Sequence, residues 1–180
     1  MKWLPAPAFL PLLLAVGLGG CAGPVETHVR SGGAGVRGAA QLMWAPGPDG
    51  ETPPPMLAGA QKAMEAALRK RGFQFGDAAP VMVAIGVAER PAGIALKGAA
   101  DEALSRAKRR RLFQDCADRL LRMTVSLTDS ASGETLYHGE AQEAHCQAAL
   151  DEVLPRLAAS AVADIAAPGT EHRRFTLARD

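Results

Sequence analysis

The stretch from residue 120 to residue 144 constrains the fold more than any other part of this sequence. In "LLRMTVSLTD" (120–129), apolar and polar side chains alternate from Leu121 onward, which is the period of a β-strand with one buried face. "DSASGE" (129–134) has the composition of a tight turn, and Gly133 suits a left-handed conformation there. "TLYHGEAQEA" (135–144) then returns along the first segment. We therefore expect these segments to form an antiparallel hairpin.

The register of this hairpin is expected to follow its hydropathy and charge. Pairing Val125 with Tyr137 brings apolar side chains together on one face and places Arg122 opposite Glu140 on the other. A four-residue loop closed by Asp129 and Glu134 would shift the pairing of the two strands by one residue from this register. We therefore expect one β-bulge within the hairpin.

Two cysteines flank the hairpin, and the same register places Cys116 opposite Cys146. Antiparallel partners lie about 4.5–5.5 Å apart at Cα, which a disulfide accepts. The alternatives are two free thiols, or a metal site formed by this pair with His138 and His145. Adjacent residues of a strand point to opposite faces, and no C-x-x-C spacing is present. We therefore expect a disulfide and no metal site.

Two other segments have the apolar spacing of amphipathic helices, and we expect helices over 56–71 and 151–166. Gly72 can cap the first helix. Pro155 is expected near the first turn of the second, because an interior proline costs about 3 kcal/mol or more. The residues expected to be buried are Met56, Leu57, Ala60, Met64, Ala67 and Leu68 in the first helix, and Val153, Leu154, Leu157, Ala158, Ala161, Val162 and Ile165 in the second.

The remaining segments complete an α+β fold. The apolar run 80–89 indicates a covered strand, 36–44 a first strand, and the tail from residue 173 a short edge strand. The sequence of residues 90–115 does not distinguish a helix from a loop, and one interpretation is a loop with a helical stretch from about Asp101. We expect a mostly antiparallel sheet of about four to five strands, with the two helices packed on one face.

The first twenty residues have the pattern of a secretory signal peptide. Lys2 precedes an apolar stretch, small residues follow, and three prolines make the segment a poor membrane-spanning helix. Its end, Leu18-Gly19-Gly20-Cys21, resembles the bacterial lipobox, whose cysteine is acylated and becomes the first residue after cleavage. We expect a signal peptide at 1–20, a lipidated N-terminus and flexible tether at 21–35, and one domain at 36–180.

Lipidation predicts where the protein resides. Acyl-chain burial contributes about 0.8 kcal/mol per methylene, so several chains, such as palmitate, make a durable membrane anchor. Ala22, rather than aspartate, follows the cysteine. By resemblance to lipoprotein sorting rules, this favours the outer membrane. We expect the domain to face the periplasm, an oxidising compartment without nucleotides.

Charge and composition exclude several classes of partner. Without residues 1–20, the chain has 19 acidic and 19 basic residues, so no net charge draws it toward nucleic acid. Aromatic residues are only 4%, too few for a base-stacking surface. Gly33 to Gly38 match G-x-G-x-x-G, but a tether precedes them and a strand-like segment follows. We therefore expect no nucleic-acid partner and no cofactor.

The densest run of positive charge is "RAKRRR" (106–111). Such a run is most often a solvated helix face or a loop. The alternative is contact with anionic head groups or lipopolysaccharide phosphates. The residues that would make this contact are Arg106, Lys108, Arg109, Arg110 and Arg111.

No catalytic motif is present in the sequence. There is no G-x-S-x-G nucleophile motif and no Cys–His constellation of a familiar kind. Carboxylates are scattered over expected surfaces, and His138 is expected to be a partly exposed residue opposite Thr124. We therefore expect no enzymatic activity and no catalytic residues.

Several segments together resemble an uncharacterised family of small bacterial envelope lipoproteins, a domain of unknown function. They are "AQLMWAP", "LRKRGF", "VMVAIGVA" and "LTDSASGETLYHGEA". The resemblance covers most of residues 36–166 and supports the fold and location without lending catalytic residues. The basic segment, the cysteine pair and the tail depart from it. The matching positions are Trp44, Pro46, Arg71, Gly72, Phe73, Asp129, Gly133, Tyr137 and Gly139.

These expectations describe a non-catalytic accessory or interaction lipoprotein of the outer membrane. Its partners would be the membrane, through Cys21, and another envelope protein. The alternative is a binding module for an envelope lipid or glycan, acting through residues 106–111.

Overall fold

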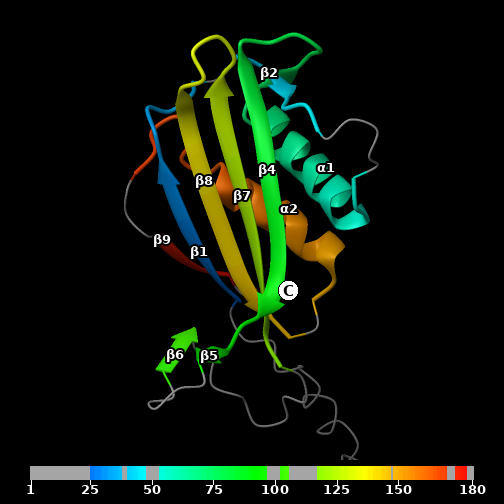
Figure 1. Ribbon diagram of the computed structural model, residues 1–180, viewed down its shortest axis with the longest axis vertical. Helices are drawn as coiled ribbons and strands as arrows, with labels where there is room; N and C mark the ends of the chain where they lie inside the picture. Colours follow the sequence, from blue (N-terminus) through cyan, green and yellow to red (C-terminus); the bar gives the residue numbers. More distant parts are fainter. Residues whose placement is uncertain are drawn as a thin grey trace, which may run out of the picture.

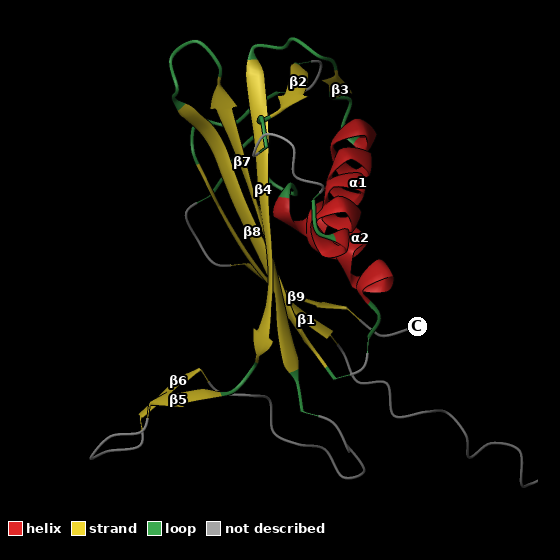
Figure 2. Cartoon of the chain, turned by 45° about the vertical axis from the view of Figure 1, so that its right-hand side comes forward, coloured by secondary structure: helices red, strands yellow, loops and turns green. Residues whose placement is uncertain are grey.

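The computed structural model describes residues 25–37, 40–47, 53–96, 102–105, 117–146, 148–169 and 173–177, with side chains except in 94–96, 102–105 and 173–177. A long twisted sheet carries two helices on one face (Figures 1 and 2). The expected α+β class is confirmed. Within this part of the chain, no helix is long and apolar enough to cross a membrane.

The sheet has seven strands in the order β3-β2-β4-β7-β8-β1-β9, and β5 and β6 form a separate pair. The chain runs through β1 (Val25–Gly32), β2 (Gln41–Trp44), α1 (Pro55–Lys70), β3 (Gln74–Phe75), β4 (Val81–Pro91), β5 (Ile94–Leu96), β6 (Glu102–Ser105), β7 (Arg119–Asp129), β8 (Thr135–His145), α2 (Leu150–Ala161) and β9 (Arg173–Leu177).

The sheet is larger and less uniform than expected. Seven strands replace the expected four to five, and β2 pairs in parallel with both β3 and β4. The remaining pairs in this sheet are antiparallel. The parallel pairs arise because α1 crosses over between β2 and β3, as parallel connections require.

The expectation of a flexible tether at 21–35 is wrong for residues 25–32. These residues form β1, which pairs with both β8 and β9. Val25, Thr27 and Val29 are buried on alternate positions, so this short segment has strand periodicity despite its polar residues. Gly32 ends the strand, and the next residue, Gly33, has φ +108°, a left-handed conformation that lets the chain turn away. The folded domain therefore begins before residue 36.

The hairpin forms as expected, but its register differs by two residues. Val125 faces Gly139 instead of Tyr137, which faces Leu127. The expected bulge is present between Leu127 and Thr128, and its extra residue lies in β8, whereas the expected register needs it in β7. Arg122 and Glu140 still form an ion pair, diagonally across the strands.

Contacts with α2 explain this register. An added Cβ at Gly139 would lie 2.0 Å from the carbonyl oxygen of Ala161, so only glycine fits beneath the end of the helix. The Tyr137 hydroxyl donates a hydrogen bond to that same oxygen at 2.6 Å. Burial, with a smaller contribution from Asp164, raises the pKa of Tyr137 well above its usual value. Tyr137 and Gly139 therefore fix β8 against α2.

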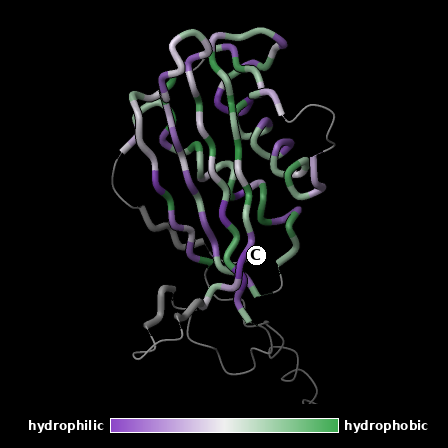
Figure 3. The backbone as a smooth tube through the Cα atoms, in the orientation of Figure 1, coloured by the Kyte–Doolittle hydropathy of each residue, from purple (hydrophilic) through white to green (hydrophobic). Residues whose placement is uncertain are grey.

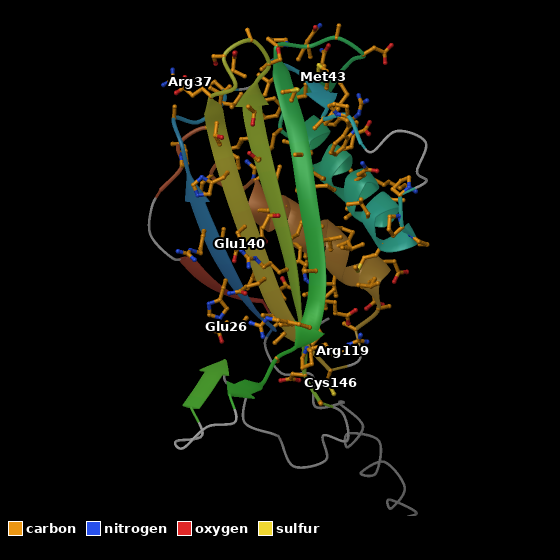
Figure 4. The ribbon with its side chains drawn as sticks, viewed as in Figure 1. Glu26, Arg37, Met43, Arg119, Glu140 and Cys146 are labelled. Atoms are coloured by element: carbon orange, nitrogen blue, oxygen red, sulfur yellow. The ribbon has the colours of Figure 1, made fainter. Side chains whose placement is uncertain are left out.

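The core lies between the sheet and the helices. All seven residues expected to be buried in and after α2 are buried, as are Ala60, Met64 and Leu68 of α1. On the strands, hydrophobic and hydrophilic stretches alternate (Figure 3). The other face of the sheet is open, and Glu140 and His138 belong to it (Figure 4). His138 is exposed, as expected, but faces Ser126 rather than Thr124.

The expected helical stretch from about Asp101 is wrong for residues 102–105. These form β6, antiparallel to β5 and apart from the main sheet (Figure 1). The expected edge strand near the C-terminus is confirmed as β9.

Candidate functional site

A groove of about 710 Å³ lies between α1 and α2 (Figure 2 shows the two helices side by side). Its α1 wall is one stripe of residues three or four positions apart, which is the spacing of a single helix face. The apolar residues of this wall are Pro55, Met56, Gly59, Ala63, Ala66 and Ala67, and α2 supplies Leu150, Leu154, Pro155 and Ala159. The groove faces solvent, because the buried stripes of both helices contact the sheet.

Small residues on α1 make the groove concave. An added Cβ at Gly59 would lie 3.3 Å from Leu154 Cδ1, so the helices approach closely at this point. Further along α1, Ala63, Ala66 and Ala67 leave space that larger side chains would fill. A substitution that enlarges one of these residues would therefore close the groove.

The charged residues of the groove are Lys62 and Lys70 on α1 and Asp151 on α2. All three are exposed. Two cations against one carboxylate favour an anionic group on any ligand that lies there.

A second cluster of polar residues is buried beneath the start of α2 and centres on Glu143. Thr27 and Glu143 face each other across β1 and β8, and both are fully buried. The Thr27 hydroxyl donates to Glu143 Oε1 at 2.6 Å. His145 Nε2 lies 2.8 Å and an Arg156 terminal nitrogen 3.1 Å from Glu143 Oε2. Glu143 therefore joins two strands to one helix.

Glu143 stays ionised despite its burial. Desolvation acts to raise its pKa, but hydrogen bonds from His145, Thr27 and Arg156 outweigh burial and lower the pKa below the usual value. An ionised carboxylate only accepts hydrogen bonds, so His145 donates from Nε2. Within the described residues, His145 Nδ1 has no hydrogen-bond partner.

The geometry of this cluster favours a structural role. A carboxylate beside an imidazole can serve acid–base catalysis. Here both carboxylate oxygens already accept hydrogen bonds, and neither Glu143 nor His145 lines the groove. We interpret the cluster as a tie between β1, β8 and α2.

Sequence reasoning identified neither of these two features. The signal for the buried cluster was present, because Glu143 and His145 continue the inward row of Tyr137, Gly139 and Ala141 on β8. A charged residue on a buried row indicates a hydrogen-bond or ion-pair partner, because burial of an unpaired charge is unfavourable. The groove had no comparable signal, since it depends on how two distant helices cross.

Most residues predicted to have a function lie outside the described part of the chain. These are the lipidation residue Cys21, the cysteine Cys116 and the basic residues Arg106, Lys108, Arg109, Arg110 and Arg111. Cys146 directly follows β8 and lies near Arg119 at one end of the sheet (Figure 4). The Cys116–Cys146 disulfide stays a prediction.

The two histidines of the alternative metal site are not brought together. His138 and His145 lie on opposite faces of β8, as their odd separation requires. Within the described residues, no three His, Cys, Asp or Glu side chains are grouped to hold a metal ion.

Comparisons with known proteins bear on the fold alone. No family model and no curated protein matches the chain. A PDZ domain protein from Parabacteroides distasonis is similar in structure, with a TM-score of 0.53, 10% identity and 86% of this chain covered. This chain spans only 40% of that protein. At this identity, the likeness shows a shared fold and transfers no function.

PelC from Paraburkholderia phytofirmans, solved as a dodecamer, gives a TM-score of 0.47 at 16% identity. The match covers 79% of this chain and 99% of PelC. A PelC variant with one leucine replaced by methionine, also a dodecamer, gives 0.42 at 14% identity, covering 78% and 98% of the two chains.

Proposed function

We propose that this protein is a lipid-anchored, non-catalytic interaction module of the bacterial outer membrane, facing the periplasm. The observation that carries the proposal is Leu18-Gly19-Gly20-Cys21 at the end of an apolar leader. The first strand of the sheet begins at Val25, only four residues after Cys21, so an acyl anchor there would hold the domain close to the membrane surface.

The exposed groove supports the interaction part of the proposal. Apolar residues of both helices face solvent along it, and exposed apolar surface of this kind marks binding sites. We also propose an envelope protein as a partner, which would contact the domain outside this groove.

The test is the intact mass of the protein extracted from native envelopes. We expect a chain that begins at Cys21 and carries a diacylglyceryl group and a further acyl chain. The control is Cys21→Ser, which removes the acylated sulfur and should release the protein from the outer-membrane fraction. An unacylated chain, or a Cys21→Ser protein that stays in that fraction, would overturn the proposal.

A second candidate is binding of an envelope lipid or glycan through residues 106–111. The observation that favours it is five positive charges within six residues, directly after β6, which lies apart from the main sheet (Figure 1). Charge reversal at 108–111 should abolish association with anionic lipid vesicles at low salt. If the unacylated protein with its native residues ignores such vesicles, this candidate is wrong.

A further inference from the structure

We propose that the groove between α1 and α2 binds a fatty carboxylate with an extended alkyl chain. This is a ligand site separate from the anchor at Cys21 and from the basic segment. Its volume of about 710 Å³ and its apolar lining with a few polar groups are those of a small-molecule site.

The dimensions of the groove favour a single extended chain. Its α1 wall runs from Pro55 to Lys70, which is about 22 Å at 1.5 Å per residue. Dividing the groove volume of about 710 Å³ by that length gives a mean cross-section of about 32 Å². A helix about 10–12 Å in diameter has a cross-section of about 80 Å² or more. A whole helix of a partner protein therefore could not be enclosed in the groove, and only side chains from one of its faces could enter.

The walls favour an alkyl chain over an extended peptide. Both walls are helices, whose interior N–H and C=O groups are bonded within the helix. An extended peptide in the groove would bury its own backbone polar groups against apolar side chains without hydrogen-bond partners. An alkyl chain has no such groups, so its burial carries no comparable penalty.

The charges orient the ligand. Lys62 and Lys70 lie on the same wall, while Asp151 is the acidic residue of the lining. Gly59 packs against Leu154, which is one turn from Asp151, so Asp151 lies toward the opposite end of the groove from Lys70. A carboxylate is therefore attracted toward Lys70 and repelled from the Asp151 end, with its alkyl chain between them.

The test uses residues 21–180 with Cys21→Ser, so that every described residue is kept and no acyl chain is attached. The probe is laurate, titrated calorimetrically below its micelle concentration. Dodecyltrimethylammonium, with the same chain length and the opposite charge, is the comparison ligand. We expect saturable binding of one laurate and binding of the cation at least about tenfold weaker, because two lysines face the ligand.

Two pairs of variants locate the site. Ala66→Phe fills the groove and should weaken laurate binding at least about tenfold, whereas Ala58→Phe, on an exposed α1 position outside the lining, should not. Lys62→Gln with Lys70→Gln should remove the preference for laurate over the cation. Arg37→Gln, an exposed charge outside the groove lining (Figure 4), should leave it unchanged. Thermal unfolding confirms that each variant is folded.

Three results would overturn the proposal. The first is no laurate binding, or equal binding after Ala66→Phe. The second is a concentration-dependent dimer that Ala66→Phe abolishes, which would make a second copy of the chain the occupant. The third is laurate binding by the Cys21→Ser chain but not by acylated protein, which would make the anchor's own acyl chain the occupant. The first two do not depend on the mass measurement that tests the anchor, and the third applies only to protein that this measurement shows to be acylated.

Discussion

At the scale of single residues, Glu143 is the most informative position. It is a fully buried carboxylate that accepts hydrogen bonds from β1, from β8 and from α2. Burying a charge is unfavourable unless it is paired and hydrogen-bonded. Hydrogen bonds from its three partners therefore offset the cost of burying the charge. Removing the charge leaves these donors without an acceptor.

We predict that Glu143→Gln lowers the free energy of unfolding by about 2–3 kcal/mol. Glutamine has only one acceptor oxygen. Its NH2 group is a donor, so it cannot accept the hydrogen bonds that His145 and Arg156 donate to the carboxylate. The Arg156 side chain is 37% exposed, so water partly compensates it. Urea denaturation measures the loss. Glu140→Gln is the control on the open face of the same strand and should cost under about 1 kcal/mol. Equal losses in the two variants would contradict the proposed tie.

The lowered pKa of Glu143 predicts how stability depends on pH. A carboxyl group with a lower pKa in the folded state stabilises the fold above its unfolded pKa and loses this contribution as the pH falls through the folded pKa. The difference in unfolding free energy between the unmodified protein and Glu143→Gln should not decrease between pH 7 and about 5.5. This difference should become smaller as the pH falls below 4.5, the usual pKa of a glutamate side chain. His145 and Arg156 face the carboxylate in the unmodified protein and an uncharged amide in the variant. A difference that already shrinks above about pH 6 would indicate a raised pKa instead.

At the scale of elements, the contact between β8 and the end of α2 sets how the layers pack. Gly139 lets the Ala161 carbonyl approach the strand, and Tyr137 satisfies that carbonyl with a hydrogen bond. The Pro155 ring is exposed, and the helix begins at Leu150. The proline is therefore in the second turn of α2, slightly later than expected. Val153 is the first residue whose N–H bonds four residues back, so Pro155 interrupts the ladder close to its start.

Adding a methyl group at Gly139 should be strongly destabilising. The new Cβ would meet backbone at 2.0 Å, and backbone yields less readily than a side chain. We predict that Gly139→Ala costs about 3 kcal/mol or more, measured by thermal or urea unfolding. Gly76→Ala is the matched control, since an added Cβ there meets nothing within 4 Å. If both variants unfold alike, α2 does not set the register of β8.

A milder change tests the same contact. Tyr137→Phe removes the hydroxyl and leaves the Ala161 carbonyl without this donor. We predict a loss of about 1–2 kcal/mol with the fold intact. The difference in unfolding free energy measures it. A Tyr137→Phe protein as stable as the unmodified one would show that the hydrogen bond contributes nothing net.

At the scale of the whole molecule, the predicted disulfide would join the two ends of the segment 116–146, which contains β7 and β8. Arg119 faces His145 at one end of the β7–β8 ladder. Cys116 lies three residues before Arg119, and Cys146 lies one residue after His145. Continuing the observed register would set Cys146 opposite Asp118 rather than Cys116. The pairing therefore requires the chain to leave the ladder before Cys116.

We predict that Cys146→Ser lowers the free energy of unfolding by about 3–4 kcal/mol, the loop-closure contribution for a segment of this length. Cys116→Ser should have the same effect, and adding the second substitution should cost little more. The same intact-mass measurement, after alkylation without reductant, should find both cysteines unmodified. If both are alkylated, the disulfide is absent and the segment is held differently.

The sequence alone determined the elements whose signals are local. Alternation in 121–129 and the apolar stripes of α1 and α2 predicted strands and helices, because strand and helix periods can be read within a few residues. The turn at Asp129 and Gly133 was equally local, and Gly133 has the expected positive φ of 75°. These signals were enough for the α+β class.

Only the tertiary structure decided how these elements meet. The hairpin register depends on the Ala161 carbonyl above Gly139, and Thr27 reaches Glu143 across 116 residues of sequence. The groove exists because Gly59 and Leu154 bring two separate helices together. The local period of a sequence indicates which side of an element is buried. It does not indicate which atoms pack against that side, because packing between distant segments decides this. Protein interiors are close-packed, so one short contact can exclude an alternative register.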